Sequence, residues 1–140
     1  MRQSLSLLLV VLTGASACER RHPPDPRPMV QKAMHGVLVY PRSLVVGMEA
    51  GEDAAQITLA TEDSVGEVAS WFRQALTLNH WTLQSDVTGA DGSVSIAATR
   101  GNRPLWITLR PSVGAPGTTY TVIGAVVAEG DSLRLQDSVR

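Results

Sequence analysis

Apolar residues recur at helical spacing in residues 64–83, and the rest of the predicted domain is organised around this stretch. One apolar stripe is formed by Val65, Val68, Ala69, Phe72, Ala75 and Leu76, which predicts an amphipathic helix. Ser64 followed three residues later by Glu67 predicts a capping box at its start. Asn79 and His80 predict its end, because both residue types tolerate left-handed backbone. Trp71 lies at the edge of the stripe, either packed on a sheet rim or facing a partner.

Short apolar runs and alternating apolar and polar residues predict strands on both sides of this helix. Residues 36–41, 43–48 and 56–61 precede it, and residues 81–87, 93–100, 103–110 and 118–128 follow it. Gly101 and Asn102 predict a tight hairpin turn. Trp106 is expected to face outward, because Leu105 and Ile107 take inward positions. The pattern predicts an α+β fold with two layers, in which one main helix packs on an antiparallel sheet of about four or more strands.

The first residues have the three-part layout of a secretory signal peptide. Arg2 gives a short positive region, an apolar run occupies residues 5–12, and small residues occupy 13–17. The apolar run is too short to span a bilayer stably. Residues 1–17 are therefore expected to be a signal peptide that is removed on export. The alternative is a buried N-terminal helix, which the small-residue run disfavours.

The run Ala15, Ser16, Ala17, Cys18 resembles the lipobox of bacterial lipoproteins, although Ala15 stands where that family favours leucine. The resemblance implies that Cys18 becomes the mature N-terminus and carries diacylglycerol on sulfur, usually with a further acyl chain on nitrogen. Two or three acyl chains anchor a protein stably to a membrane. The competing interpretation is ordinary signal-peptidase cleavage, which leaves Cys18 as a free thiol in a secreted soluble protein. Because Cys18 is the only cysteine, no internal disulfide is expected.

Residues 18–36 are predicted to form a tether that begins at the lipidated cysteine. Four closely spaced prolines, Pro23, Pro24, Pro26 and Pro28, disfavour a helix and favour extended polyproline conformation. Residues 29–34 are compatible with either a short helix or irregular structure. The α+β domain is expected at residues 37–128, followed by a polar C-terminal tail at residues 129–140.

A second resemblance covers roughly residues 37–128. The order Tyr40-Pro41, Thr61-x-Asp63, Trp71-Phe72 with Leu76, and His80-Trp81 resembles a pattern in uncharacterised exported bacterial proteins. Those proteins have Tyr-Pro, a helix with Phe-Tyr and Leu, a Gly-Trp pair and a strand meander. This chain departs from them at Trp71-Phe72 and at His80, which replaces the glycine. The resemblance implies a fold and export, and it implies no chemistry.

The sequence contains no strong signal for catalysis or cofactor binding. A formal net charge of −1 without a dense basic run argues against a nucleic-acid partner. No nucleophile elbow, phosphate loop or paired zinc motif is present, so no catalytic residue and no cofactor are predicted. The histidines, His22, His35 and His80, are isolated in sequence, so no metal site is predicted. Three arginines, Arg100, Arg103 and Arg110, either meet at one rim of the sheet and bind an anion or are solvated strand ends.

Three classes of function are compatible with these observations. The first is a non-enzymatic, lipid-anchored module of the cell envelope, on the periplasmic or outer face, that binds a protein partner through a surface around Trp71 and Trp106. The second is a carrier of a small ligand held between helix and sheet. The third is an uncharacterised hydrolase, which is disfavoured by the lack of a convergent polar motif.

Overall fold

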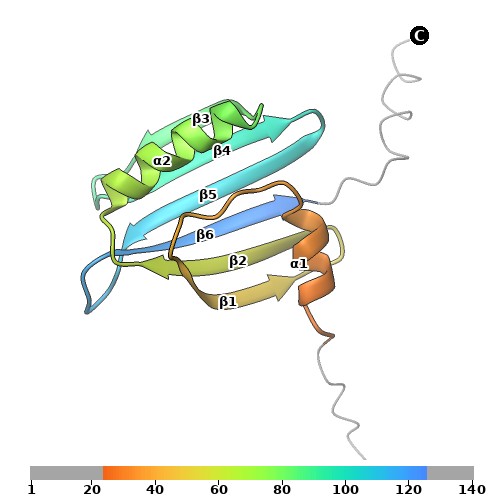
Figure 1. The fold of residues 1–140 in the computed structure, drawn as a ribbon, viewed down its shortest axis with the longest axis horizontal. Coiled ribbons are helices and arrows are strands. Elements are labelled where there is room, and N and C mark those ends of the chain that lie inside the picture. Colours follow the sequence, from red (N-terminus) through yellow and green to blue (C-terminus); the bar gives the residue numbers. More distant parts are fainter. Residues whose placement is uncertain (1–23, 126–140) are drawn as a thin grey trace, which may run out of the picture.

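The computed structural model describes residues 24–125 of the 140-residue chain and shows two helices on one antiparallel sheet (Figure 1). The helices are α1 (Arg27–Ala33) and α2 (Val65–Leu78). The strands are β1 (Leu44–Ala50), β2 (Ala54–Thr61), β3 (Thr82–Thr88), β4 (Val94–Arg100), β5 (Arg103–Pro111) and β6 (Thr118–Ala125). In space the strands follow the order β1-β2-β6-β5-β4-β3, so β1 and β3 are the two edges. The predicted α+β class with an antiparallel sheet is confirmed.

The expectation of one main helix is not confirmed, because α1 also packs on the sheet. It begins inside the stretch that was predicted to be an extended tether. Proline is tolerated in the first turn of a helix, where its missing N–H has no intrahelical partner, and Pro26 and Pro28 occupy the helix start. Val30 and Ala33 of α1 are buried in the core, although they precede the range expected for the domain.

The short strand predicted at residues 36–41 is wrong. These residues form no ladder, and β1 begins only at Leu44. The backbone N–H of Tyr40 donates instead to the side-chain hydroxyl of Tyr120, at 3.1 Å. Pro41 has no N–H to offer to a neighbouring strand. Residues 34–43 therefore cross the inner face of the sheet as an irregular segment between α1 and β1 (Figure 1).

Alternation along the central strands separates a buried inner face from an exposed outer face. The inner face carries Ile57 and Leu59 of β2, Ile96 of β4, Leu105, Ile107 and Leu109 of β5, and Tyr120 and Val122 of β6, all buried. Trp106 faces outward and is 45% exposed, as predicted. Side chains alternate between faces of a strand, so a single shift of register would expose the whole inner set.

Helix α2 begins and ends as the sequence predicts. The Ser64 hydroxyl accepts the Glu67 N–H, and the Glu67 carboxylate accepts the Ser64 N–H at 3.0 Å, which completes the capping box. At the other end His80 has a φ of 62°, in the left-handed region. The N–H of Trp81 donates to the carbonyl of Leu76 and the N–H of His80 to that of Thr77, which is a Schellman motif.

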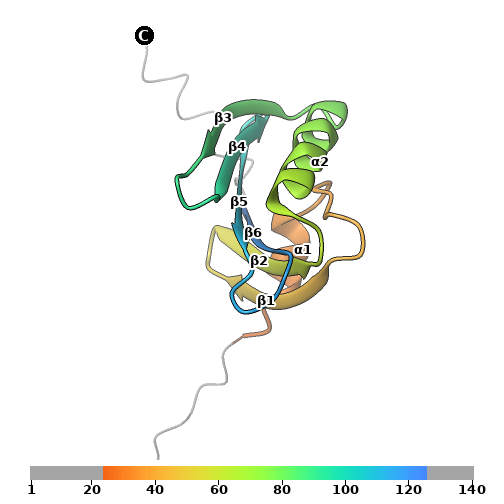
Figure 2. The same ribbon diagram turned by 90° about the vertical axis from the view of Figure 1, so that its left-hand side faces the viewer.

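The helices divide the inner face between them. Helix α1 contacts β1, β2 and β6, whereas α2 contacts β3, β4 and β5. Figure 2 shows both on the same side of the sheet. Gly124 of β6 allows the close approach of α1, because a Cβ there would lie 2.7 Å from the carbonyl oxygen of Ala33. Within residues 24–125 no helix is long and apolar enough to cross a membrane.

Candidate functional site

Helix α1, helix α2 and the crossing segment together cover the inner face of the sheet. The candidate site is the line along which residues 37–43 of the crossing segment meet α2, which we call the seam. Val37 and Tyr40 pack against the core, whereas Leu38 and Val39 between them are each 48% exposed. Figure 1 shows the crossing segment passing between α2 and the region covered by α1. The seam therefore joins two segments that are distant in sequence: the crossing segment between α1 and β1, and helix α2 between β2 and β3.

Four aromatic rings connect the surface of the seam to the centre of the core. Tyr40 meets Trp71 with ring centroids 5.4 Å apart, Trp71 meets Phe72 at 5.0 Å, and Phe72 meets Tyr120 at 5.4 Å. All three contacts are edge-to-face, the arrangement that aromatic quadrupoles favour. The rings lie in three different segments, so together they hold residues 37–43, α2 and β6 against one another.

Hydrogen bonds link the last of these rings, Tyr120, back to the segment that carries the first, Tyr40. The Tyr120 hydroxyl accepts the N–H of Tyr40 at 3.1 Å and donates to Ser43 Oγ at 2.7 Å. Burial is the main reason that the pKa of Tyr120 is raised above its usual value. The hydroxyl is thus a neutral, fully used hydrogen-bonding group beneath the crossing segment.

A surface hollow of about 680 Å³ lies over the seam. Its lining combines the two outer aromatic side chains with polar groups of α2; the residues are Tyr40, Gly66, Glu67, Ser70, Trp71 and Gln74. Aromatic walls with a few polar groups are typical of small-molecule sites. We call this hollow the seam groove.

Carboxylates determine the charge at one end of the seam groove. The pKa of Tyr40 is raised, first because its hydroxyl donates a hydrogen bond to Asp63, and then through burial and the negative charge of Asp63 and Glu67. The pKa of Glu67 is lowered, because the hydroxyl and backbone N–H of Ser64 donate to its carboxylate. Arg42 Nη2 lies 4.0 Å from Asp63 Oδ2. Both carboxylates therefore have structural partners.

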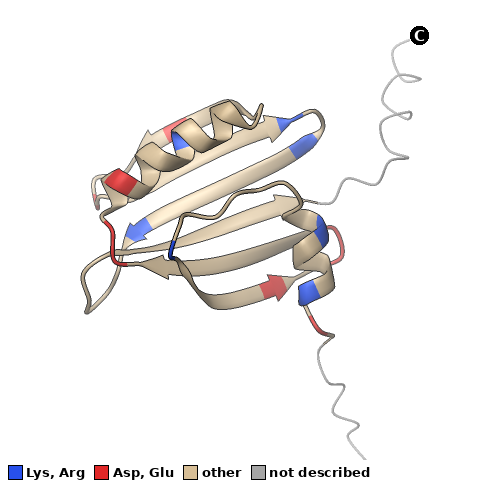
Figure 3. Ribbon diagram, in the orientation of Figure 1, with Lys and Arg blue, Asp and Glu red and all other residues tan. Residues whose placement is uncertain are grey.

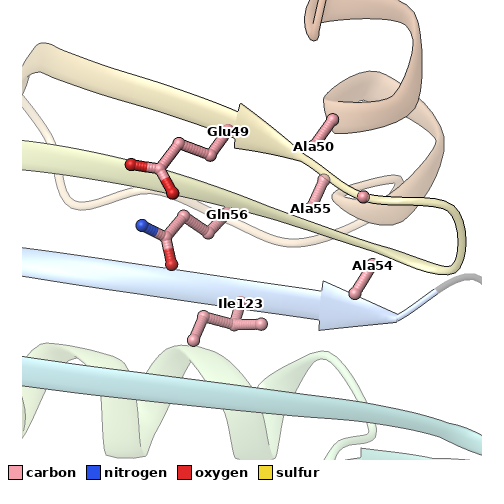
Figure 4. A pocket seen from close by; sticks show the side chains of 7 residues that line it. Glu49, Ala50, Ala54, Ala55, Gln56 and Ile123 are labelled. Carbon is pink, nitrogen blue, oxygen red and sulfur yellow. The ribbon is translucent and has the colours of Figure 1, made fainter.

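Two further hollows lie away from the seam, on the outer face of the sheet. One, of about 290 Å³, is formed where β1, β2 and β6 adjoin, and Figure 4 shows Glu49, Gln56 and Ile123 around it. The other, of about 660 Å³, includes Thr108, Thr119 and Arg110. Neither contains an aromatic side chain, and Glu49 and Gln56 are the polar side chains of the first. What distinguishes the seam groove from both is its pair of aromatic walls, Tyr40 and Trp71.

The arginines that sequence analysis singled out are divided between the two ends of the sheet. Arg100 and Arg103 are paired neighbours across the β4–β5 hairpin, whereas Arg110 lies towards the other end of β5. Arg103 donates to the carbonyl of Ala33, the last residue of α1, at 3.2 Å and to that of His35, just after the helix, at 3.1 Å. Arg100 stacks on Trp81 with its guanidinium 4.7 Å from the ring centroid. The pair thus fastens α1 and the end of α2 to the sheet.

The structure separates the two tryptophans that were nominated as one partner surface. Trp71 lies in the seam groove, half-buried, whereas Trp106 lies on the opposite, outer face of the sheet. Cys18, the predicted lipidation residue, lies outside the described residues. Among residues 24–125 no group of three or more His, Cys, Asp or Glu side chains is placed to hold a metal ion.

Tyr120 is the central residue that sequence reasoning missed. Its only signal is an aromatic ring at an inward position of a strand composed mainly of threonine, valine and isoleucine. Tyr40 was part of the quoted Tyr-Pro motif but had no assigned role. Their pairing joins residues 80 positions apart, which no local pattern reveals.

Residues 39–121 match the START domain-like family, so the chain belongs to that family. The match runs from the crossing segment, which includes Tyr40, to β6. Comparison with curated proteins and with solved structures found no match.

Proposed function

We propose that the protein is an exported, lipid-anchored module that binds a small ligand in the seam groove. Membership of the START domain-like family favours a ligand-binding module. The observation that carries the proposal is the seam itself, where Tyr40 and Trp71 line a hollow directly above the buried Phe72 and Tyr120. The site differs from a cavity between helix and sheet, because side chains fill the space beneath the seam.

The lining indicates the chemical character of the ligand. Two aromatic side chains favour an apolar or aromatic group, and Ser70 and Gln74 offer hydrogen bonds to one polar group. We propose a binder and not an enzyme, because Glu67 and Asp63 have structural partners in Ser64 and Tyr40. The anchor is proposed at Cys18, on the lipobox-like run that ends at the sole cysteine.

The experiment isolates the protein from membranes, extracts it with organic solvent and identifies bound small molecules by mass spectrometry. Ser70→Trp fills the seam groove with a bulky side chain, and Ser95→Trp adds the same bulk on the outer face of β4. Both serines are exposed, so neither change should unfold the domain. We expect a ligand with the parent and with Ser95→Trp, and its loss with Ser70→Trp. An extract without ligand, or equal retention by both variants, would contradict the proposal.

A further inference from the structure

Three consecutive apolar side chains are exposed at one edge of the sheet. Leu44, Val45 and Val46 of β1 are 73%, 51% and 59% exposed. Leu44 pairs with Ala60 and so lies on the outer face, whereas Val45 pairs with Leu59 on the inner face. The two faces and the rim of this edge are therefore all apolar at the start of β1.

The β1 edge is poorly suited to pairing with another strand. The register of β1 against β2 shifts between Val45 and Gly47, which marks a bulge at Val46. Bulges at sheet edges bend the strand and interrupt the row of hydrogen-bonding groups that a partner strand needs. The apolar side chains at this edge are thus better suited to contact an apolar surface than to flank a further paired β-strand.

The chain enters the domain on the side where β1 lies. Figure 1 and Figure 2 both show β1 and the start of α1 at the lower side of the domain. From Cys18 to Pro24 is six residues, which reach at most about 20 Å even when fully extended. An anchor at Cys18 would therefore hold this edge near the bilayer and at high effective concentration.

We propose that the β1 edge, through Leu44, Val45 and Val46, rests on the surface of the bilayer that holds the anchor. The proposal relies on the lipid-anchor part of the proposed function and is independent of the ligand. Glu49 is the only charged residue of β1, and Figure 3 shows no basic residue on this strand. Arg42, two residues before Leu44, is exposed but lies 4.0 Å from the carboxylate of Asp63. Attachment through β1 itself is therefore apolar, and we expect it to need no anionic lipid.

The test places a fluorescent label on each edge of the lipidated protein in phosphatidylcholine vesicles that contain a spin-labelled quencher lipid. Val46→Cys carries the label on β1, and Val87→Cys carries it on β3, the opposite edge, where the valine is equally exposed at 58%. Acylated Cys18 does not react with the label. We expect several-fold stronger quenching for Val46→Cys than for Val87→Cys, with no decrease at high salt. Equal quenching, or none in either variant, overturns the proposal.

The same preparation separates failure of the anchor from failure of the docking surface. Intact mass shows directly whether Cys18 is acylated, so an unmodified chain contradicts the anchor. In that case both labels are placed in a Cys18→Ser background and measured at high lipid concentration. Preferential quenching of Val46→Cys there still supports an apolar docking edge, and equal quenching refutes it.

Discussion

The hydroxyl of Tyr120 accepts the backbone N–H of Tyr40, a residue 80 positions earlier in the chain. This one side chain of β6 therefore fixes the segment that crosses the sheet, because the same hydroxyl also donates to Ser43 Oγ. Without it, the Tyr40 N–H has no strand to pair with. The seam groove depends on a hydrogen bond that belongs to neither helix.

Tyr120→Phe is expected to destabilise the domain by about 1–3 kcal/mol, because it leaves a part-buried donor unpaired. Urea unfolding measures the loss, and hydrogen exchange should show faster exchange of the Tyr40 amide. Tyr40→Phe is the control, since it keeps the backbone N–H and loses only the hydrogen bond of its hydroxyl to Asp63. A larger loss from Tyr40→Phe would show that the ring hydroxyl of Tyr120 is not the fastening group.

Phe72→Ala is expected to cost about 3–5 kcal/mol, because the ring is 1% exposed and contacts both Trp71 and Tyr120. That is a large share of the stability of a small domain. Glu67→Gln should cost much less, since glutamine also closes a capping box. The test compares the urea midpoints of unfolding of both variants with that of the parent. An unchanged midpoint for Phe72→Ala would contradict the burial of this ring in the core.

The ion pair between Arg73 and Asp86 should make stability depend on pH. Arg73 Nη2 donates to Asp86 Oδ1 at 2.9 Å, which holds the pKa of Asp86 below its usual value. The stabilisation is present above the unfolded pKa of about 3.9 and is lost as pH falls through the lower folded value. Both side chains are about a third exposed, so it amounts to about 1 kcal/mol or less.

Asp86→Asn is therefore expected to lower stability at neutral pH and to approach the parent as the pH falls below the lowered pKa of Asp86. Thermal unfolding across this range measures the difference. Arg73→Gln should show the same loss at neutral pH, and the double variant should be no worse than either single one. Parent-like stability of Asp86→Asn at every pH would mean that the pair contributes nothing.

His80→Gly is expected to stabilise the protein by up to about 1 kcal/mol, because glycine adopts the left-handed backbone without steric cost. His80→Ala is the matched control, since it removes the imidazole and keeps the unfavourable φ. Urea midpoints should rise only for His80→Gly. An equal rise for both would show that loss of the imidazole, and not relief of the backbone, is responsible.

The sequence pattern predicted those features of the fold that depend on residues close together in the chain. The capping box of Ser64 and Glu67 and the left-handed stop at His80 lie within single turns, so neighbouring residues suffice to specify them. The outward position of Trp106 followed from strand alternation alone.

The parts that were missed depend on contacts between distant segments. Helix α1 was not expected to start at Arg27, because closely spaced prolines favour extended chain. Here the last two, Pro26 and Pro28, instead lie at the start of a helix that packs on the sheet. Its burial depends on Gly124, close to the far end of the described chain. The seam groove likewise depends on Tyr120, whose role becomes visible only when β6 is placed between β2 and β5.

The central position of β6 has a consequence for the order in which the chain folds. Pairing of β2 with β6 joins residues 54–61 to residues 118–125. Contacts between distant residues carry a large loop-closure entropy and slow folding. The β1–β2 hairpin and the meander from β3 to β6 can form locally, but the two parts join only after β6 has been synthesised. The sheet therefore stays open during synthesis, and we expect folding to be limited by this late closure.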